Sequence, residues 1–194
     1  MHALIIFVRN PEPGRVKTRL AATLGDEKAL HIYKDLLNHT RSVSRLSSAH
    51  KFVFYHNEID WDDEWNVPDF NKRLQSNSNL GGKMMSAFEE IFLADYDKVI
   101  IIGSDCFELT TAYIETAFSY LDDKDVVIGP ASDGGYYLLG MKRMHSCFFS
   151  NKKWSTDSVY TATLQDATLH GLSVASLPVL TDVDTEADWL ITKK

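Results

Sequence analysis

The sequence predicts a three-layer α/β/α fold built on a mostly parallel sheet. Residues 99–102 are four consecutive β-branched apolar residues, a run typical of a strand buried on both faces. Similar short runs alternate along the chain with segments whose apolar residues recur at helical spacing. We find no internal repeat and no linker. Alternating strands and helices of this length indicate a parallel sheet with helices on both faces.

The strands are predicted from apolar runs bounded by Gly, Pro, Asn or Asp. Gly103 follows the central run, allows the chain to turn, and delivers Asp105 at the end of the strand. A hairpin is expected at Asp133-Gly134, because Asp-Gly between two apolar runs is a turn signal. The expected strands are 4–8, 51–55, 70–74, 99–104, 126–130, 136–141 and 173–177.

The helices are predicted from the period of their apolar residues. Asp26 is expected to N-cap the first helix, whose apolar residues recur at helical spacing from Ala29 to Val43. Another opens at Leu80, and a third follows the central strand. Residues 155–170 form a fourth, with Val159, Ala162 and Leu169 facing inward, and a short last helix follows residues 182–185.

Composition excludes several classes of protein. With 194 residues, we expect one domain over 1–194. The net charge of −7 argues against a nucleic-acid or membrane-surface partner. No run of 18 apolar residues predicts a membrane span, and the N-terminus reads as a first strand rather than a signal peptide. Two cysteines are too few for a disulfide scaffold, so a cytoplasmic setting is expected.

A cluster of cations follows the first strand, in an otherwise acidic chain. It consists of Arg9, Arg15, Lys17 and Arg19, with Gly14 in the same loop. Such a loop suits phosphate oxygens, through backbone N–H groups and through bidentate arginine. A solvated charged turn is the alternative. The segment is neither a P-loop nor a G-x-G-x-x-G dinucleotide motif.

Asp105 is a candidate metal ligand, because ligands bind at the carboxyl ends of strands in open α/β sheets. Its carboxylate suits Mg²⁺ or Mn²⁺, which prefer oxygen ligands. The alternative is that Asp105 only accepts hydrogen bonds from backbone N–H groups of the turn. Cys106 beside it is expected to be a packed residue rather than a nucleophile.

Two further acidic motifs have a functional and a structural interpretation. Asp133, Gly134, Gly135 and Tyr136 could form a sugar or acceptor pocket against bare backbone, or simply a hairpin. Asp182 and Asp184 share one face if the chain is extended, which would suit a metal ion or an attacking hydroxyl group. Alternatively, Asp184 caps the last helix.

Taken in order, these segments resemble the bacterial glycosyltransferase-like family called radical-SAM/selenodomain-associated transferase 1. The resemblance spans nearly the whole chain. It is carried by residues 7–20, 80–84, 103–106, 129–137, 154–156 and 182–185.

The resemblance implies a nucleotide-diphospho-sugar transferase fold, similar to GT-A glycosyltransferases and to 2-phospho-lactate guanylyltransferases. It implies that the loop after the first strand holds the nucleotide and that Asp105 is the metal aspartate. The family usually has Arg where this chain has Lys83, and Pro where it has Phe107. Lys83 keeps the charge of a phosphate contact but loses the bidentate fork.

Three functions follow from this sequence. The first is a metal-dependent glycosyltransferase, in which Lys17, Arg19 and a Mg²⁺ or Mn²⁺ ion on Asp105 and Asp184 neutralise the departing nucleoside diphosphate of a nucleotide sugar. Asp133 or Asp184 would be the base for a small-molecule acceptor. The second is a nucleotidyltransferase that releases pyrophosphate from a nucleoside triphosphate. The third is a non-catalytic nucleotide-binding module on the same fold.

Overall fold

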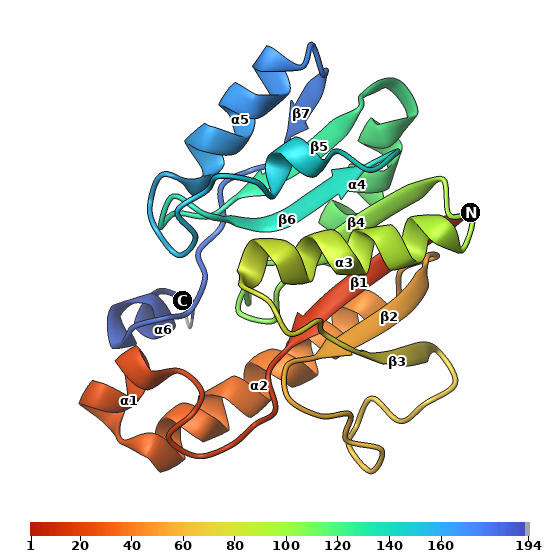
Figure 1. Ribbon diagram of the computed structural model, residues 1–194. Helices are drawn as coiled ribbons and strands as arrows, with labels where there is room; N and C mark the ends of the chain where they lie inside the picture. The colour runs from red at the N-terminus through yellow and green to blue at the C-terminus, as the bar shows by residue number, and fades with distance from the viewer. Residues whose placement is uncertain (193–194) are drawn as a thin grey trace.

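A computed structural model describes residues 1–192 of the protein (Figure 1). The strands are β1 His2–Val8, β2 His50–Tyr55, β3 Phe70–Leu74, β4 Lys98–Ile102, β5 Val126–Pro130, β6 Tyr136–Met141 and β7 Val174–Ser176. The helices are α1 Thr18–Leu24, α2 Asp26–Arg45, α3 Leu80–Leu93, α4 Thr111–Asp123, α5 Val159–Leu169 and α6 Glu186–Ile191, with a 3₁₀ turn, η1, at Ser146–Phe148. No helix within these 192 residues is long and apolar enough to cross a membrane.

The strands form one sheet in the order β3-β2-β1-β4-β6-β5-β7. β1 is parallel to β2 and β4, β2 is parallel to β3, and β5 is parallel to β7. β6 is antiparallel to both of its neighbours, β4 and β5. The predicted mostly parallel sheet is therefore confirmed, and the Asp133-Gly134 segment joins β5 to β6 as the expected hairpin.

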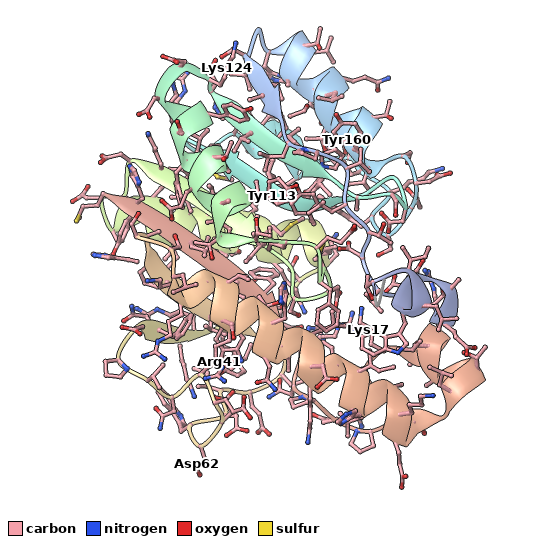
Figure 2. The ribbon with its side chains drawn as sticks, turned by 180° about the vertical axis from the view of Figure 1, so that it is seen from behind. Lys17, Arg41, Asp62, Tyr113, Lys124 and Tyr160 are labelled. Carbon is pink, nitrogen blue, oxygen red and sulfur yellow. The ribbon has the colours of Figure 1, made fainter. Side chains whose placement is uncertain are left out.

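Apolar layers cover both faces of the sheet, because successive side chains of a strand point to opposite faces. In β1, Leu4, Ile6 and Val8 join a buried cluster that includes α4 and part of α2. Ala3 and Ile5 join a second cluster with α3 and α5. Figure 1 shows α3 across one face of the sheet, and Figure 2, seen from behind, shows α2 and α4 across the other. The three-layer prediction is confirmed.

A third apolar cluster lies beyond the carboxyl end of β1. Val16, Leu20 and Val183 pack there with Ile32 and Leu36 of α2. α1 and α6 lie side by side at this end of the molecule (Figure 1). They flank the sheet edge at which open α/β proteins bind ligands.

Two expectations for the N-terminal half were wrong. Gly25 takes the N-cap position of α2, and Asp26 is the first residue of the helix, where its charge complements the helix dipole. The basic segment is not entirely a loop, because α1 forms within it around the fully buried Leu20. Helices of seven residues depend on tertiary packing, which periodicity does not reveal.

Two expectations later in the chain also needed correction. α5 begins at Val159 rather than near 155, and its buried positions are Val159, Thr163 and Ala167. Leu169 follows Ala167 by two residues, which places it on the opposite side of the helix, and it is 81% exposed. β4 ends at Ile102, so Gly103 and Ser104 lie beyond the strand.

Candidate active site

A cavity of about 890 Å³ lies at the carboxyl ends of β1 and β4. It collects segments that are far apart in the sequence, as expected at this edge of a parallel sheet. The residues predicted for a site that line it are Arg9, Arg15, Lys17, Arg19, Lys83, Asp105, Asp133, Gly135, Tyr136 and Asp184.

Gly14 and Gly134, also predicted for the site, do not line this cavity. Gly14 lies in a tight turn in which the N–H of Arg15 donates to the carbonyl of Glu12. Gly134 has a φ of 88°, and a Cβ there would lie 2.2 Å from the carbonyl oxygen of Asp157. Both glycines therefore have a local structural role, and Gly134 lets the hairpin approach the start of α5.

Lys17 bridges the two carboxylates that were predicted to hold a metal ion. Its Nζ lies 2.7 Å from Oδ1 of Asp105 and 3.0 Å from Oδ1 of Asp184. The side chain is only 5% exposed (labelled in Figure 2). Burial alone lowers the pKa of Lys17, but the charges of Asp105 and Asp184 raise it, and the net direction is upward. The ammonium is therefore charged at neutral pH. The Asp105 carboxylate forms an ion pair with it and does not only accept hydrogen bonds within the turn.

Residues 182–184 form an extended segment beside Asp105. The N–H of Val183 donates to the carbonyl of Asp105 at 2.8 Å, and the Val183 side chain is fully buried. Asp182 and Asp184 flank it and both line the cavity. Asp184 does not cap α6. Thr185 does, in a capping box with Asp188, which leaves the Asp184 carboxylate to Lys17 and, at 3.6 Å, to Arg19.

Asp182 is a half-buried acid, predicted only as a partner of Asp184 for a metal ion or an attacking hydroxyl group. Burial and then the charge of Asp105 raise the pKa of Asp182 to about 7, with smaller contributions from Asp133 and Asp184. Because their charges act on Asp182, the carboxylates of Asp105, Asp133 and Asp184 lie in the same region of the cavity as that of Asp182. Lys17 only partly offsets their charge, so this side of the cavity favours a further cation.

The other side of the cavity carries unpaired cations. Nζ of Lys83 lies 2.9 Å from Nδ1 of His56, and burial and the charge of Arg9 lower the pKa of Lys83. Burial, Lys83 and Arg9 likewise lower the pKa of His56. Neither Arg9 nor Lys83 forms an ion pair with any carboxylate among the described residues 1–192. This side of the cavity therefore favours an anion.

His56 and Trp154 line the cavity although no site role was predicted for them. His56 directly follows β2, which pairs with β1 so that Tyr55 lies opposite Val8. This register places His56 at the same sheet edge as the segment after β1, which is the feature of the sequence that could have predicted its place in the site. Trp154 packs so closely on Gly81 of α3 that a Cβ at Gly81 would lie 2.4 Å from the indole nitrogen.

The residues present fit a hard divalent cation, although a complete site is not formed. Within residues 1–192, no three His, Cys, Asp or Glu side chains are arranged to hold a metal ion. Asp105 and Asp184 nevertheless supply oxygen donors, and Lys17 already places a cation between them. Mg²⁺ is commonly held by one or two carboxylates, with water and substrate phosphates as its other ligands.

A family model matches residues 39–156, which include Lys83, Asp105 and the Asp133 hairpin. The chain belongs to the DUF2064 family. Its members are described as uncharacterized proteins conserved in bacteria. No curated protein matches the sequence.

Solved structures show the same fold over nearly the whole DUF2064 chain. A candidate nucleotide-diphospho-sugar transferase from Desulfovibrio desulfuricans G20 is 31% identical, with a TM-score of 0.91 over 98% of this chain and 85% of that one. The inositol-1-phosphate CTP transferase from T. maritima is 14% identical, with a TM-score of 0.64 over 100% and 94% of the two chains. Rv0371C from Mycobacterium tuberculosis H37Rv, in complex with manganese, is 13% identical, with a TM-score of 0.59 over 98% and 96%. The last two establish the fold alone.

Proposed function

We propose that this DUF2064 protein is a metal-dependent transferase that moves a glycosyl group from a nucleotide sugar to a small acceptor. One observation carries the proposal: cations of the segment after β1 and carboxylates after β4 and β7 face one cavity. Likeness to the candidate nucleotide-diphospho-sugar transferase supports the choice of donor. The finer family resemblance, to radical-SAM/selenodomain-associated transferases, agrees with it.

In this proposal, Arg15, Lys17 and Arg19 contact the diphosphate of the donor. Arg15 and Arg19 line the cavity with side chains 74% and 72% exposed. Each forms an exposed ion pair, Arg15 with Glu12 at 3.2 Å and Arg19 with Asp184 at 3.6 Å, which a phosphate group could replace. Asp105 and Asp184 hold the divalent cation, Mg²⁺ or Mn²⁺, which offsets charge on the departing nucleoside diphosphate.

Asp133 is the better candidate for the acceptor base. Asp184 is assigned to the divalent cation and contacts Lys17 and Arg19, whereas Asp133 forms no ion pair within residues 1–192. It accepts one hydrogen bond, from the N–H of Gly135 at 2.8 Å. The acceptor oxygen would attack the anomeric carbon, the bond from that carbon to the β-phosphate oxygen would break, and Asp133 would take the acceptor proton. Gly135 and Tyr136 form the adjacent acceptor or sugar pocket.

Nucleotidyl transfer is the second candidate. The unpaired Arg9 and Lys83, added to the segment after β1, suit the larger charge of a nucleoside triphosphate. In this case the acceptor oxygen would attack the α-phosphorus and pyrophosphate would leave. The fold of the inositol-1-phosphate CTP transferase is compatible with this reaction.

A substrate panel separates these reactions. The full chain is incubated with Mn²⁺ and either nucleotide sugars or nucleoside triphosphates, and released nucleoside diphosphate and pyrophosphate are measured. The glycosyltransferase proposal expects nucleoside diphosphate from one sugar donor. Pyrophosphate release without it supports nucleotidyl transfer. If no nucleotide with Mn²⁺ turns over or raises the melting temperature, the protein is not a nucleotide-dependent transferase.

A further inference from the structure

Lys17 is held in an unusual way for a surface-loop lysine. Its backbone is left-handed, with a φ of 49° and a ψ of 46°, a region that residues with a side chain rarely adopt. Its carbonyl accepts the N–H of Ala21, which starts α1. The strained backbone and the first turn of α1 together direct the side chain into the cavity. Such strain persists only where the surroundings fix it, and it is common at binding sites.

The Lys17 ammonium and a divalent cation compete for the same atoms. Nζ contacts Oδ1 of both Asp105 and Asp184, at 2.7 and 3.0 Å. A Mg²⁺ ion lies about 2.0–2.1 Å from its oxygen ligands. Because the Lys17 side chain is only 5% exposed, little water screens its ammonium, and a second cation on the same pair of oxygens would be repelled. Either Lys17 or the metal ion can therefore occupy the gap between these carboxylates, but not both.

Phosphate offers the displaced ammonium a new partner. Lys17 lies in the basic segment that the proposed function assigns to the donor diphosphate, beside Arg15 and Arg19. A lysine side chain has a flexible four-carbon stem, and its compact ammonium group binds phosphate oxygens well. A turn of the side chain, without movement of α1, exchanges carboxylate for phosphate.

We infer that Lys17 is a tethered counter-ion, which neutralises Asp105 and Asp184 until a nucleotide phosphate draws it away and a divalent cation replaces it. This inference rests on the proposed nucleotide site. It makes metal and phosphate binding cooperative: each ligand removes an obstacle to the other, and by linkage the effect is reciprocal. The metal ion alone then binds weakly, because it must first expel a buried ammonium.

The matched control is another buried lysine. Lys72 is 2% exposed, and its Nζ lies 2.7 Å from Oδ1 of Asp63, outside the cavity. Lys72→Met therefore removes a comparable Lys–Asp pair and tests whether lost packing or lost charge alone changes metal binding.

The experiment measures Mn²⁺ binding by calorimetry and by Mn²⁺ electron paramagnetic resonance, on wild type, Lys17→Met and Lys72→Met. Lys17→Met should bind Mn²⁺ about tenfold more tightly than wild type, within the usual range of coupling between sites. Lys72→Met should bind it as wild type does. In wild type, inorganic pyrophosphate should raise the affinity for buffered free Mn²⁺ by a similar factor, and Lys17→Met should lose most of that gain.

The wild-type titration with pyrophosphate needs no variant, so the inference stays testable if Lys17→Met fails to fold. Equal or weaker Mn²⁺ binding by folded Lys17→Met overturns the inference, and so does independence of Mn²⁺ and pyrophosphate in wild type. These results do not depend on turnover. An inactive substrate panel with the expected Mn²⁺ results would overturn the proposed function and leave the exchange of Lys17 supported.

Discussion

The two sides of the cavity differ in how their charges are compensated. On the side of β4 and residues 182–184, Asp105 and Asp184 share the buried ammonium of Lys17. On the side of β2 and α3, Arg9 and Lys83 approach each other without a carboxylate partner in residues 1–192. We call these the acidic side and the basic side.

This difference indicates what each side still requires. On the acidic side, Lys17 occupies the gap between Asp105 and Asp184, so a cation that binds both carboxylates must exchange with it. On the basic side, burial and then the charge of Arg9 lower the pKa of Lys83, and an anion would relieve the repulsion between these two cations. A substrate with phosphate groups and an associated divalent cation satisfies both sides at once, which a neutral sugar alone does not.

The largest effect is expected from Asp105→Asn. The amide keeps the size of the side chain but removes the negative charge that faces Lys17 and the proposed cation. Transfer should fall by about 10²–10³-fold, as when one electrostatic contact to developing charge is lost. Initial rates at saturating donor check this, together with Mn²⁺ calorimetry, which should show weaker binding.

Asp63→Asn is the control for Asp105→Asn. It also breaks a Lys–Asp pair, with the buried Lys72, but outside the cavity. It should lower the free energy of unfolding and leave the rate near that of wild type. If both variants lose the rate equally, the acidic side has no special part in the reaction.

An intermediate effect is expected on the basic side, from Lys83→Met. Removing one unpaired cation should raise the KM for the nucleotide substrate about tenfold, the value of a charge-assisted hydrogen bond of roughly 1.4 kcal/mol. The Mn²⁺ affinity should be unchanged. Lys83→Arg should bind at least as well as wild type. If Lys83→Met and Lys83→Arg raise the KM equally, the size of the side chain at residue 83 matters and its charge does not.

Gly103 directly follows β4, lines the cavity, and tests whether this part of the cavity must stay open. A Cβ at Gly103 would meet no atom within 4 Å, and the residue lines the cavity. Gly103→Ala should therefore weaken nucleotide binding severalfold and leave the free energy of unfolding unchanged or higher by about 0.4–1 kcal/mol. Calorimetric titration and urea unfolding measure the two quantities.

Gly171→Ala should show the opposite pattern. Its surroundings are also open, but its φ is 62°, and it lies outside the cavity. The variant should lose about 1 kcal/mol of stability, because alanine is strained in this region, and keep its affinity. Unchanged nucleotide affinity in Gly103→Ala would show that no ligand contacts the cavity at residue 103.

The fold was largely predictable because its signal is local. The β-branched run 99–102 and the apolar run 4–8 each reflect burial in a sheet with helices on both faces. Errors arose where tertiary packing decided. Leu20 stabilises the short α1, Gly25 displaces Asp26 from the N-cap, and Leu169 faces away from the core. In a helix, an offset of one or two residues is enough to move a side chain from the buried face to the exposed face.

The candidate site was predictable in its members but not in their pairing. The position of Asp105 after a strand, and of the cations after β1, could be read from sequence because strand ends share an edge. Nothing in the spacing of Lys17, Asp105 and Asp184 indicated that the lysine would lie between the two acids. The histidines of the chain have no metal-ligand spacing, so the only signal for His56 is its location directly after β2.

The smallest effect is expected at the cap that supports the acidic side. Thr185 accepts the N–H of Asp188, and Oδ2 of Asp188 accepts the N–H groups of Asp184 and Thr185. Thr185→Ala should cost about 1 kcal/mol of unfolding free energy. It should weaken Mn²⁺ binding at most about fivefold, because only the backbone support of Asp184 is loosened.

Thr110→Ala is the comparison for Thr185→Ala. Thr110 accepts the N–H of Tyr113 at the start of α4, away from the cavity lining. Urea unfolding should report a similar loss of stability in both variants, while Mn²⁺ calorimetry should report a change only for Thr185→Ala. If Thr110→Ala weakens Mn²⁺ binding as much, the effect follows from global stability, and the acidic side does not depend on the capping box for the position of Asp184.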